Sequence, residues 1–318
     1  MDTTLSGRLH SLWKAIKINK EIYLMLLPGI IFIVFVKYVP MYGIQIAFKS
    51  FDPFLGVWKS PYAGFGYFVQ AFESEIFWRS FKNTIIIAFA KFIVGMPMPI
   101  LLAIMFNQLR IYYLKKIVQT VSYFPHLISW VVVGGLSYSF LGTFGFINKI
   151  LMSMGLDRVM FYQDADVWLP ILVITDVWKG IGWGSILYLA ALSAVNTDLY
   201  DAVEIDGGGR FRKIQHVDLP VLMPVFAILL ILNSSSLVSG NFDQVYALIG
   251  DSIVASNSLL AAKAETLEIY TYRVGLLEGS FSFSGAIGFF QNVLAAILIF
   301  TTNYIAGRIY EDKRLTLF

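Results

Sequence analysis

The chain has 318 residues, of which 57% are hydrophobic and only 14% are charged, whereas about a quarter of the residues in soluble domains are charged. Its net charge is +3 and it has no cysteine, which excludes disulfides, thiolate metal sites and thiol catalysis. No lysine-rich or arginine-rich stripe suits nucleic acid. The apolar excess instead predicts an all-α integral membrane protein with lipid as its burial medium.

Six continuous apolar segments follow one another, each long enough for a membrane-spanning helix. Barrel strands would alternate between apolar and polar residues, so helices are the predicted element. The first segment is expected to be retained as a span, because Lys37, Tyr38 and Pro40 follow it in place of a small-residue cleavage site. The predicted spans are residues 22–48, 84–106, 117–141, 167–192, 221–239 and 285–307.

The predicted organisation is therefore a tail at residues 1–21, a six-helix transmembrane domain at residues 22–307 and a second tail at residues 308–318. Cytoplasmic loops are normally enriched in lysine and arginine. Both tails, and the connections after spans two and four, carry most of the basic residues and are predicted to be cytoplasmic. These residues are Arg8, Lys14, Lys17, Lys20, Arg110, Lys115, Lys116, Arg210, Arg212, Lys213, Arg308, Lys313 and Arg314.

The three remaining loops are longer, hold fewer basic residues and should face outward. The first of them, residues 51–81, is rich in phenylalanine, tyrosine and tryptophan. Aromatic rings at this depth normally anchor a protein among lipid headgroups. A ring-stacking surface for sugar is the alternative interpretation.

The connection between spans four and five, residues 198–220, has the pattern of a compact docking element. Residues 200–205 can form a short helix, and the glycines at 207–209 supply the backbone freedom for a sharp turn. A second short helix is expected after the turn. It should end at Leu219, because the residue before a proline is disfavoured in helical geometry.

Apolar residues recur every third position in that second helix, at Phe211, Ile214 and Val217. This spacing predicts an apolar stripe on one face. The basic residues Arg210 and Arg212 would remain available for a cytosolic partner.

This loop resembles the EAA loop of ABC importer permeases, whose pattern is E-A-A, two residues, D-G-A, and a series that ends in L-P. Residues 201–203 occupy the first positions, residues 206–208 the second, and residues 219–220 the last. Asp201 replaces the usual glutamate and Val203 the second alanine. The resemblance to LplB-like sugar permeases covers nearly the whole chain, including residues 27–29, 37–43, 83–84 and 178–183.

The resemblance implies a type I ABC importer permease in the bacterial cytoplasmic membrane. Its implied partners are a second homologous permease, two cytosolic ABC ATPases and an extracytoplasmic solute-binding protein. The implied substrate is an oligosaccharide, with uronic-acid-containing ones included. The residues implied to couple the chain to the ATPases are Asp201, Ala202, Val203, Glu204, Asp206, Gly207, Gly208, Arg210, Phe211, Arg212, Leu219 and Pro220.

The sequence contains no G-x-x-x-x-G-K-[ST] phosphate loop. The chain is therefore expected to be a transport subunit without catalytic residues, metal ligands or a cofactor of its own. ATP and Mg²⁺ would be bound by the partner ATPases.

Ionisable residues at membrane depth normally face a protein interior or an aqueous cavity. Asp176 and Lys179 are three residues apart on one helix, so they are predicted either to neutralise each other or to bind ligand. Lys37 is expected to extend toward the outer surface. The candidate residues of the substrate pathway are Trp178, Lys179, Tyr188, Asn233, Ser234, Asn241 and Gln291. Helix packing is the alternative role for these side chains.

Two other classes of protein are the alternatives. An ion-coupled secondary transporter acting without an ATPase would be expected to show an inverted internal repeat, and no convincing repeat is present. A membrane enzyme would need a set of catalytic residues. The sequence has only three histidines and no cysteine, so it has few residues that could form such a set.

Overall fold

The computed structural model describes residues 17–109, 111–239, 241–250 and 258–310. Within them the chain is helical, apart from connections and one isolated antiparallel bridge between Lys49 and Tyr62. Most of both predicted tails, together with Arg110, lies outside the described residues. The all-α membrane class is confirmed.

Five helical stretches are long and apolar enough to cross a membrane, at Lys20–Phe48, Glu75–Gln108, Trp130–Ser153, Arg210–Leu237 and Phe281–Arg308. Helix α10, Trp168–Ser193, has 26 residues and therefore also has the length for a span. Its Asp176, Lys179 and several glycines lower its mean hydropathy. The described residues thus hold five candidate spans by length and composition and a sixth by length alone, and the stretch Trp130–Ser153 consists of two helices, Trp130–Leu141 and Phe146–Ser153.

Helix α10 is the centre of the bundle and packs against α5 (Glu75–Gly95), α6 (Pro97–Gln108), α7 (Tyr112–Leu127) and α13 (Leu219–Asn233). Backbones approach closely at Gly182, where an added Cβ would lie 1.9 Å from the carbonyl oxygen of Ser122. One apolar core surrounds Trp168 and Leu172 near the start of α10, and another surrounds Tyr188 near its end.

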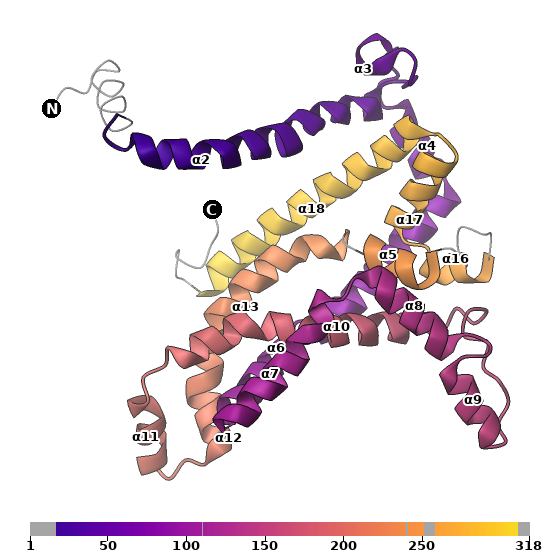
Figure 1. Cartoon of the computed structure of the whole chain (residues 1–318). Helices are drawn as coiled ribbons and strands as arrows, with labels where there is room; N and C mark the ends of the chain where they lie inside the picture. Colours follow the sequence, from indigo (N-terminus) through magenta and orange to yellow (C-terminus); the bar gives the residue numbers. More distant parts are fainter. Residues whose placement is uncertain (1–16, 110, 240, 251–257, 311–318) are drawn as a thin grey trace.

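The third predicted span is wrong as a continuous helix. Helix α7 ends at Leu127 and α8, Trp130–Leu141, begins after a break, so that the two helices meet at an angle (Figure 1). Pro125 lies in the last turn of α7, and Ser129 caps α8 by accepting a hydrogen bond from Val132. This break could not be predicted from the apolar composition of residues 117–141, because hydropathy carries no information on helix direction.

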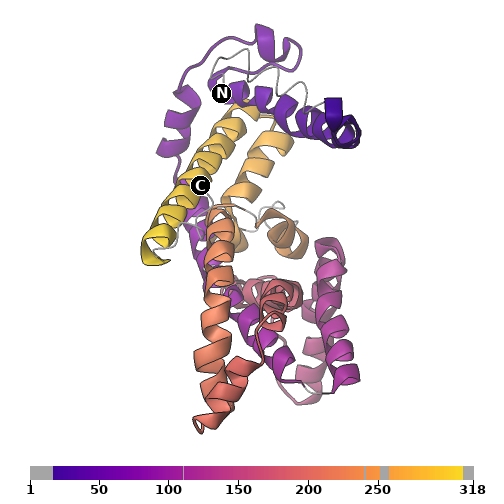
Figure 2. The same cartoon turned by 90° about the vertical axis from the view of Figure 1, so that its left-hand side faces the viewer.

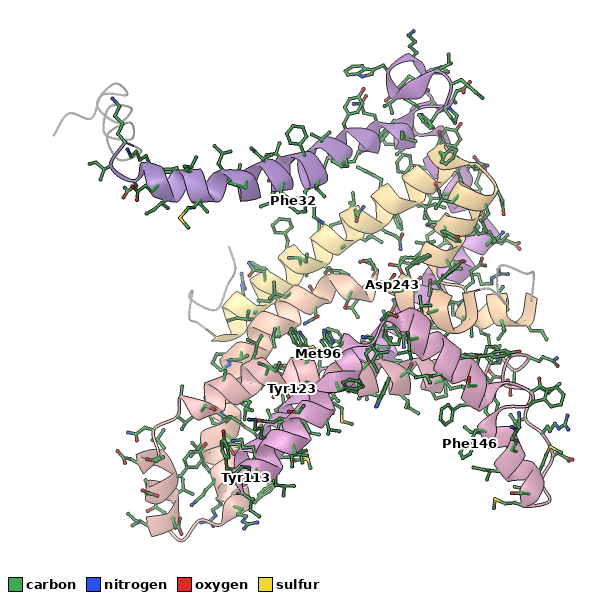
Figure 3. The ribbon with its side chains drawn as sticks, viewed as in Figure 1. Phe32, Met96, Tyr113, Tyr123, Phe146 and Asp243 are labelled. Atoms are coloured by element: carbon green, nitrogen blue, oxygen red, sulfur yellow. The ribbon has the colours of Figure 1, made fainter. Side chains whose placement is uncertain are left out.

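The remaining elements are short, and all of them lie in the connections except α9 and α12, which belong to two of the stretches named above. They are α3 (Gly56–Lys59), α4 (Gly66–Glu73), α9 (Phe146–Ser153), α11 (Asp198–Ile205), α12 (Arg210–Lys213), α14 (Phe242–Val245), α16 (Ser258–Ala264) and α17 (Leu267–Tyr272). Helix α9 projects from the bundle, with Phe146 near its start (Figure 3).

The first span, α2 (Lys20–Ile33) with its π-helical and 3-10 continuation to Phe48, stands apart from the bundle (Figures 1 and 2). No residue of α2 is buried, and Phe32 projects from it with 63% of its side chain exposed (Figure 3). The 3-10 segment Val39–Phe48 packs on the last helix, α18 (Phe281–Tyr310).

Candidate functional site

The predicted docking element is a helix, a glycine turn and a second helix at the end of the bundle that lies at the lower left of Figure 1. Gly207 has φ +72°, and its amide donates to the carbonyl oxygen of Glu204 at 3.0 Å. The next amide, that of Gly208, donates to Val203 at 2.8 Å. The predicted sharp turn is confirmed, and it uses the left-handed backbone region that favours glycine.

This loop exposes apolar side chains that the described residues of the bundle leave uncovered. Ile205 is 86% exposed, Phe211 is 78% exposed and Leu199 is 51% exposed. Of the twelve predicted coupling residues, Val203 is half-buried and Gly208 is buried. The other ten are exposed, namely Asp201, Ala202, Glu204, Asp206, Gly207, Arg210, Phe211, Arg212, Leu219 and Pro220.

Two expectations for the second helix are wrong. The apolar stripe divides, because Phe211 points outward whereas Val217 is only 4% exposed. The helix does not end at Leu219: a π-helical turn at Ile214–Asp218 leads directly into α13. Pro220 follows this π-helical turn directly and has no amide proton to donate to the preceding turn, a gap that a local π-helical adjustment can accommodate.

Tyr200 anchors the first short helix to the bundle, an interaction that no sequence pattern indicated. Its hydroxyl donates to Asp218 Oδ1 at 2.6 Å and accepts from Asn107 Nδ2 at 3.4 Å. Burial, followed by the hydrogen bond to Asp218 and its negative charge, raises the pKa of Tyr200 to about 12. The phenol therefore stays a proton donor at physiological pH.

A cavity of about 660 Å³ lies among α5, α6, α10 and α13. Its volume lies within the range of small-ligand sites. Met96, at the junction of α5 and α6, borders it near the middle of the bundle (Figure 3). Polar and aromatic side chains share its wall: Lys91, Asp176, Trp183, Tyr188, Asn233, Ser236 and Asn241.

Lys91 on α5 joins two other segments at this wall. Its Nζ lies 2.9 Å from Asp176 Oδ1 on α10 and donates to Asn241 Oδ1, also at 2.9 Å. Asn241 is 2% exposed, and its buried Nδ2 has no hydrogen-bond partner among the described residues. A buried donor without a partner is uncommon in folded proteins, and here it lies at the polar wall of the cavity.

The predicted pairing of Asp176 with Lys179 is wrong, since Asp176 pairs with Lys91 across helices. Lys179 instead donates to the carbonyl oxygen of His126 at 2.7 Å and lies 5.4 Å from the ring centroid of Trp130. The His126 carbonyl belongs to the last turn of α7, where no amide of a continuing helix is available. Lys179 therefore stabilises the break between α7 and α8.

The structure brings only part of the predicted pathway together. Tyr188, Asn233 and Asn241 line the cavity, whereas Trp178, Lys179, Ser234 and Gln291 do not. Ser234 donates to Ile231 within its own helix, and Gln291 donates to Val238. Trp178 is 43% exposed. Lys91 is not among the candidate pathway residues predicted from the sequence, because a single lysine in a span does not indicate which residues it will contact.

Replacement of Asn233 by alanine should weaken uptake of a polar ligand several-fold, while Trp178→Ala should leave it close to wild type. Asn233 lines the cavity, and loss of one neutral hydrogen bond to a ligand costs about 0.5–1.5 kcal/mol. Concentration-dependent uptake in proteoliposomes measures both variants. Equal effects of the two substitutions would contradict the assignment of Asn233 to the cavity wall.

At the opposite end of the bundle, Glu265 is 1% exposed and holds two arginines. Arg79 Nη2 lies 3.0 Å from Glu265 Oε2, and Arg273 Nη2 lies 2.9 Å from Oε1. Burial opposes the charge of Arg273, but the hydrogen bonds and charges of Glu265 and Glu278 outweigh it and raise the pKa of Arg273. This network fixes α17 against α5.

A bundle of spanning helices with a polar cavity and an exposed glycine-turn loop defines a polytopic transport subunit. Protein LplB of Bacillus subtilis (strain 168) is 38% identical over 308 residues, which cover 96% of this chain and 95% of that protein. The polygalacturonan/rhamnogalacturonan transport system permease protein YteP of the same strain is 37% identical, over 92% of this chain and 90% of that protein. No protein-family model matches the chain.

Two solved structures share the fold. A chain of a bacterial ABC transporter involved in the import of the acidic polysaccharide alginate superposes with a TM-score of 0.84 at 36% identity, covering 94% of this chain and 99% of that one. The alginate transporter in complex with alginate pentasaccharide-bound periplasmic protein gives 0.82 at 35% identity. The chain belongs to the LplB-like family of sugar permease subunits of ABC importers.

Proposed function

We propose that this permease subunit passes acidic oligosaccharides inward through the cavity between α5, α10 and α13, in alternating access driven by separate ATPases. The cavity supports this function because it combines hydrogen-bonding groups with the rings of Trp183 and Tyr188, the two features that sugar recognition requires. A polygalacturonan/rhamnogalacturonan permease and an alginate transporter among its relatives support an acidic substrate.

The observation that carries the proposal is the exposed cytoplasmic loop. Its exposed apolar side chains are explained by a cytosolic partner such as an ATPase, which a permease acting alone would lack. Ile205 and Phe211 are mostly exposed there, and Arg210 and Arg212 flank Phe211. An apolar centre with a charged rim is typical of a protein-docking surface. We assign this loop to two cytosolic ABC ATPases, one for each of two homologous permeases.

We assign α2 as the helix on which the second permease packs. Because none of the residues of α2 is buried in this chain, the helix is free to pack on a neighbouring subunit. A solute-binding protein would deliver the sugar at the opposite face. Both tails are proposed to be cytoplasmic, which agrees with α2 beginning and α18 ending toward the same side of Figure 1.

Purification of the tagged permease from its native membrane, followed by mass spectrometry, tests the assembly. We expect an ABC ATPase, a second permease and a solute-binding protein to copurify. Recovery of the permease without an ATPase, together with uptake driven by an ion gradient in liposomes, would establish the alternative of a secondary transporter.

The isolated chain is expected to hydrolyse no ATP, because its sequence lacks a phosphate-cradling loop. Phosphate release from the purified subunit in liposomes should therefore equal that of empty liposomes. The assembled complex serves as the positive control. Turnover by the single polypeptide that persists through repeated purification would contradict the assignment of ATP and Mg²⁺ to the partner subunits.

A further inference from the structure

The first short helix of the cytoplasmic loop has little apolar contact with the rest of the chain. None of the residues of α11 is buried. Its turn is held by backbone hydrogen bonds within the loop, and the exposed Glu204 pairs with Lys213 of the neighbouring α12. The hydroxyl of Tyr200 adds two partly buried attachment points between α11 and the membrane helices, Asp218 directly before α13 and Asn107 on α6.

That hydroxyl meets a carboxylate that is fully withdrawn from solvent. Asp218 is 0% exposed, and its Oδ1 accepts from Tyr200 at 2.6 Å. Its other oxygen, Oδ2, is buried without a hydrogen-bond partner in the described part of the chain. A buried carboxylate carries a large desolvation cost, so its hydrogen bond to Tyr200 is strong and costly to break.

The two residues bonded to Tyr200 lie on helices that both reach the cavity. Asp218 immediately precedes α13, whose Leu229 and Asn233 line the cavity about three and four turns further on. Asn107 lies near the end of α6, whose Pro99 lines the same cavity. A displacement of α11 is therefore passed to two walls of the cavity through stiff helices.

We propose that Tyr200 and Asp218 are positioning residues, whose hydrogen bond transmits movement of the ATPase-facing helix α11 to the helices that line the cavity. This inference rests on the proposed docking function of the loop. It adds that docking alone is not sufficient for transport. Without the link, the ATPases would bind and hydrolyse ATP, but α13 would follow α11 only through the loop backbone and the exposed Glu204–Lys213 pair, and α6 would lose its contact with Tyr200.

The test compares Tyr200→Phe with wild type in the complete transporter, reconstituted in liposomes with its ATPases and solute-binding protein. Sugar uptake per ATP hydrolysed should fall by about tenfold or more, as expected for loss of a hydrogen bond to a buried charge. The ATPase subunits should still copurify. Tyr113→Phe is the matched control, because Tyr113 is 76% exposed on α7 and should retain wild-type coupling.

A double variant, Tyr200→Phe with Asp218→Leu, distinguishes a loss of coupling between α11 and the cavity helices from a loss of folding stability. Replacing both partners by apolar groups removes the unpaired carboxylate, so the thermal midpoint should recover relative to Tyr200→Phe alone. Uptake per ATP should stay low, because the link is still absent. Recovery of uptake along with stability, wild-type coupling in Tyr200→Phe, or failure of both variants to assemble would overturn the proposal.

The proposed docking function has its own signature in the same assay. If the loop does not bind the ATPases, a disrupted glycine turn will leave ATPase copurification unchanged. If the loop binds them but Tyr200 does not transmit movement, Tyr200→Phe alone will behave as wild type. The two failures are therefore distinguishable.

Discussion

Substitution of Gly207 by valine should leave normal amounts of permease in the membrane and abolish sugar uptake. Gly207 has φ +72°, and no neighbouring atom lies within 4 Å of an added Cβ. The cost is therefore backbone strain of about 1–3 kcal/mol, which is comparable with a docking contact. Membrane level, ATPase retention and uptake of labelled oligosaccharide provide the measurements.

Gly209 provides a matched control two residues away. It has φ −80°, and an added Cβ there likewise meets no atom within 4 Å. Gly209→Val should therefore transport close to wild type, and Gly207→Asn should retain part of the activity, because asparagine tolerates the left-handed region. Equal loss in both valine variants would show that bulk in the loop, and not the positive φ, causes the defect.

Replacement of Lys91 by methionine should destabilise the assembled transporter and severely reduce uptake. The substitution leaves Asp176 without its cation at membrane depth, a change that costs about 3–5 kcal/mol for a buried pair. The Asp176 side chain keeps 32% exposure and Lys91 keeps 11%, so the lower part of that range is expected. Thermal unfolding in detergent measures the destabilisation.

The double variant Lys91→Met with Asp176→Leu should regain stability, because apolar replacement of both charges is often neutral or stabilising. Lys149→Met is the control for loss of a lysine, since Lys149 is exposed on α9. An unchanged thermal midpoint in Lys91→Met would show that water in the cavity already screens Asp176. Uptake in the double variant reports whether the pair also contacts the sugar.

The membrane class and most span positions could be predicted because each depends on composition within one segment. The turn at Gly207 was predictable for the same reason, since three consecutive glycines indicate a turn from the local sequence alone. Contacts between segments were not predictable. Lys91 and Asp176 are 85 positions apart in the sequence, and nothing nearby indicated that α5 and α10 would bring them within 2.9 Å.

The break at the end of α7 shows a different limit. Pro125 was visible in the sequence, but proline is tolerated in membrane helices when other groups satisfy the backbone. Here Lys179, 53 residues away, bonds to the carbonyl of His126. The signal for the break was thus divided between two segments, each of which looked like an ordinary part of a span.

The isolation of α2 also has a consequence for biogenesis. Since none of the residues of α2 is buried within its own chain, the proposed packing of α2 on a second permease can form only after that subunit has been synthesised and inserted. The order of events in the cell is then insertion first and assembly second. We expect an orphan copy of this permease to turn over faster than one made together with its neighbour, so that partner synthesis sets its abundance.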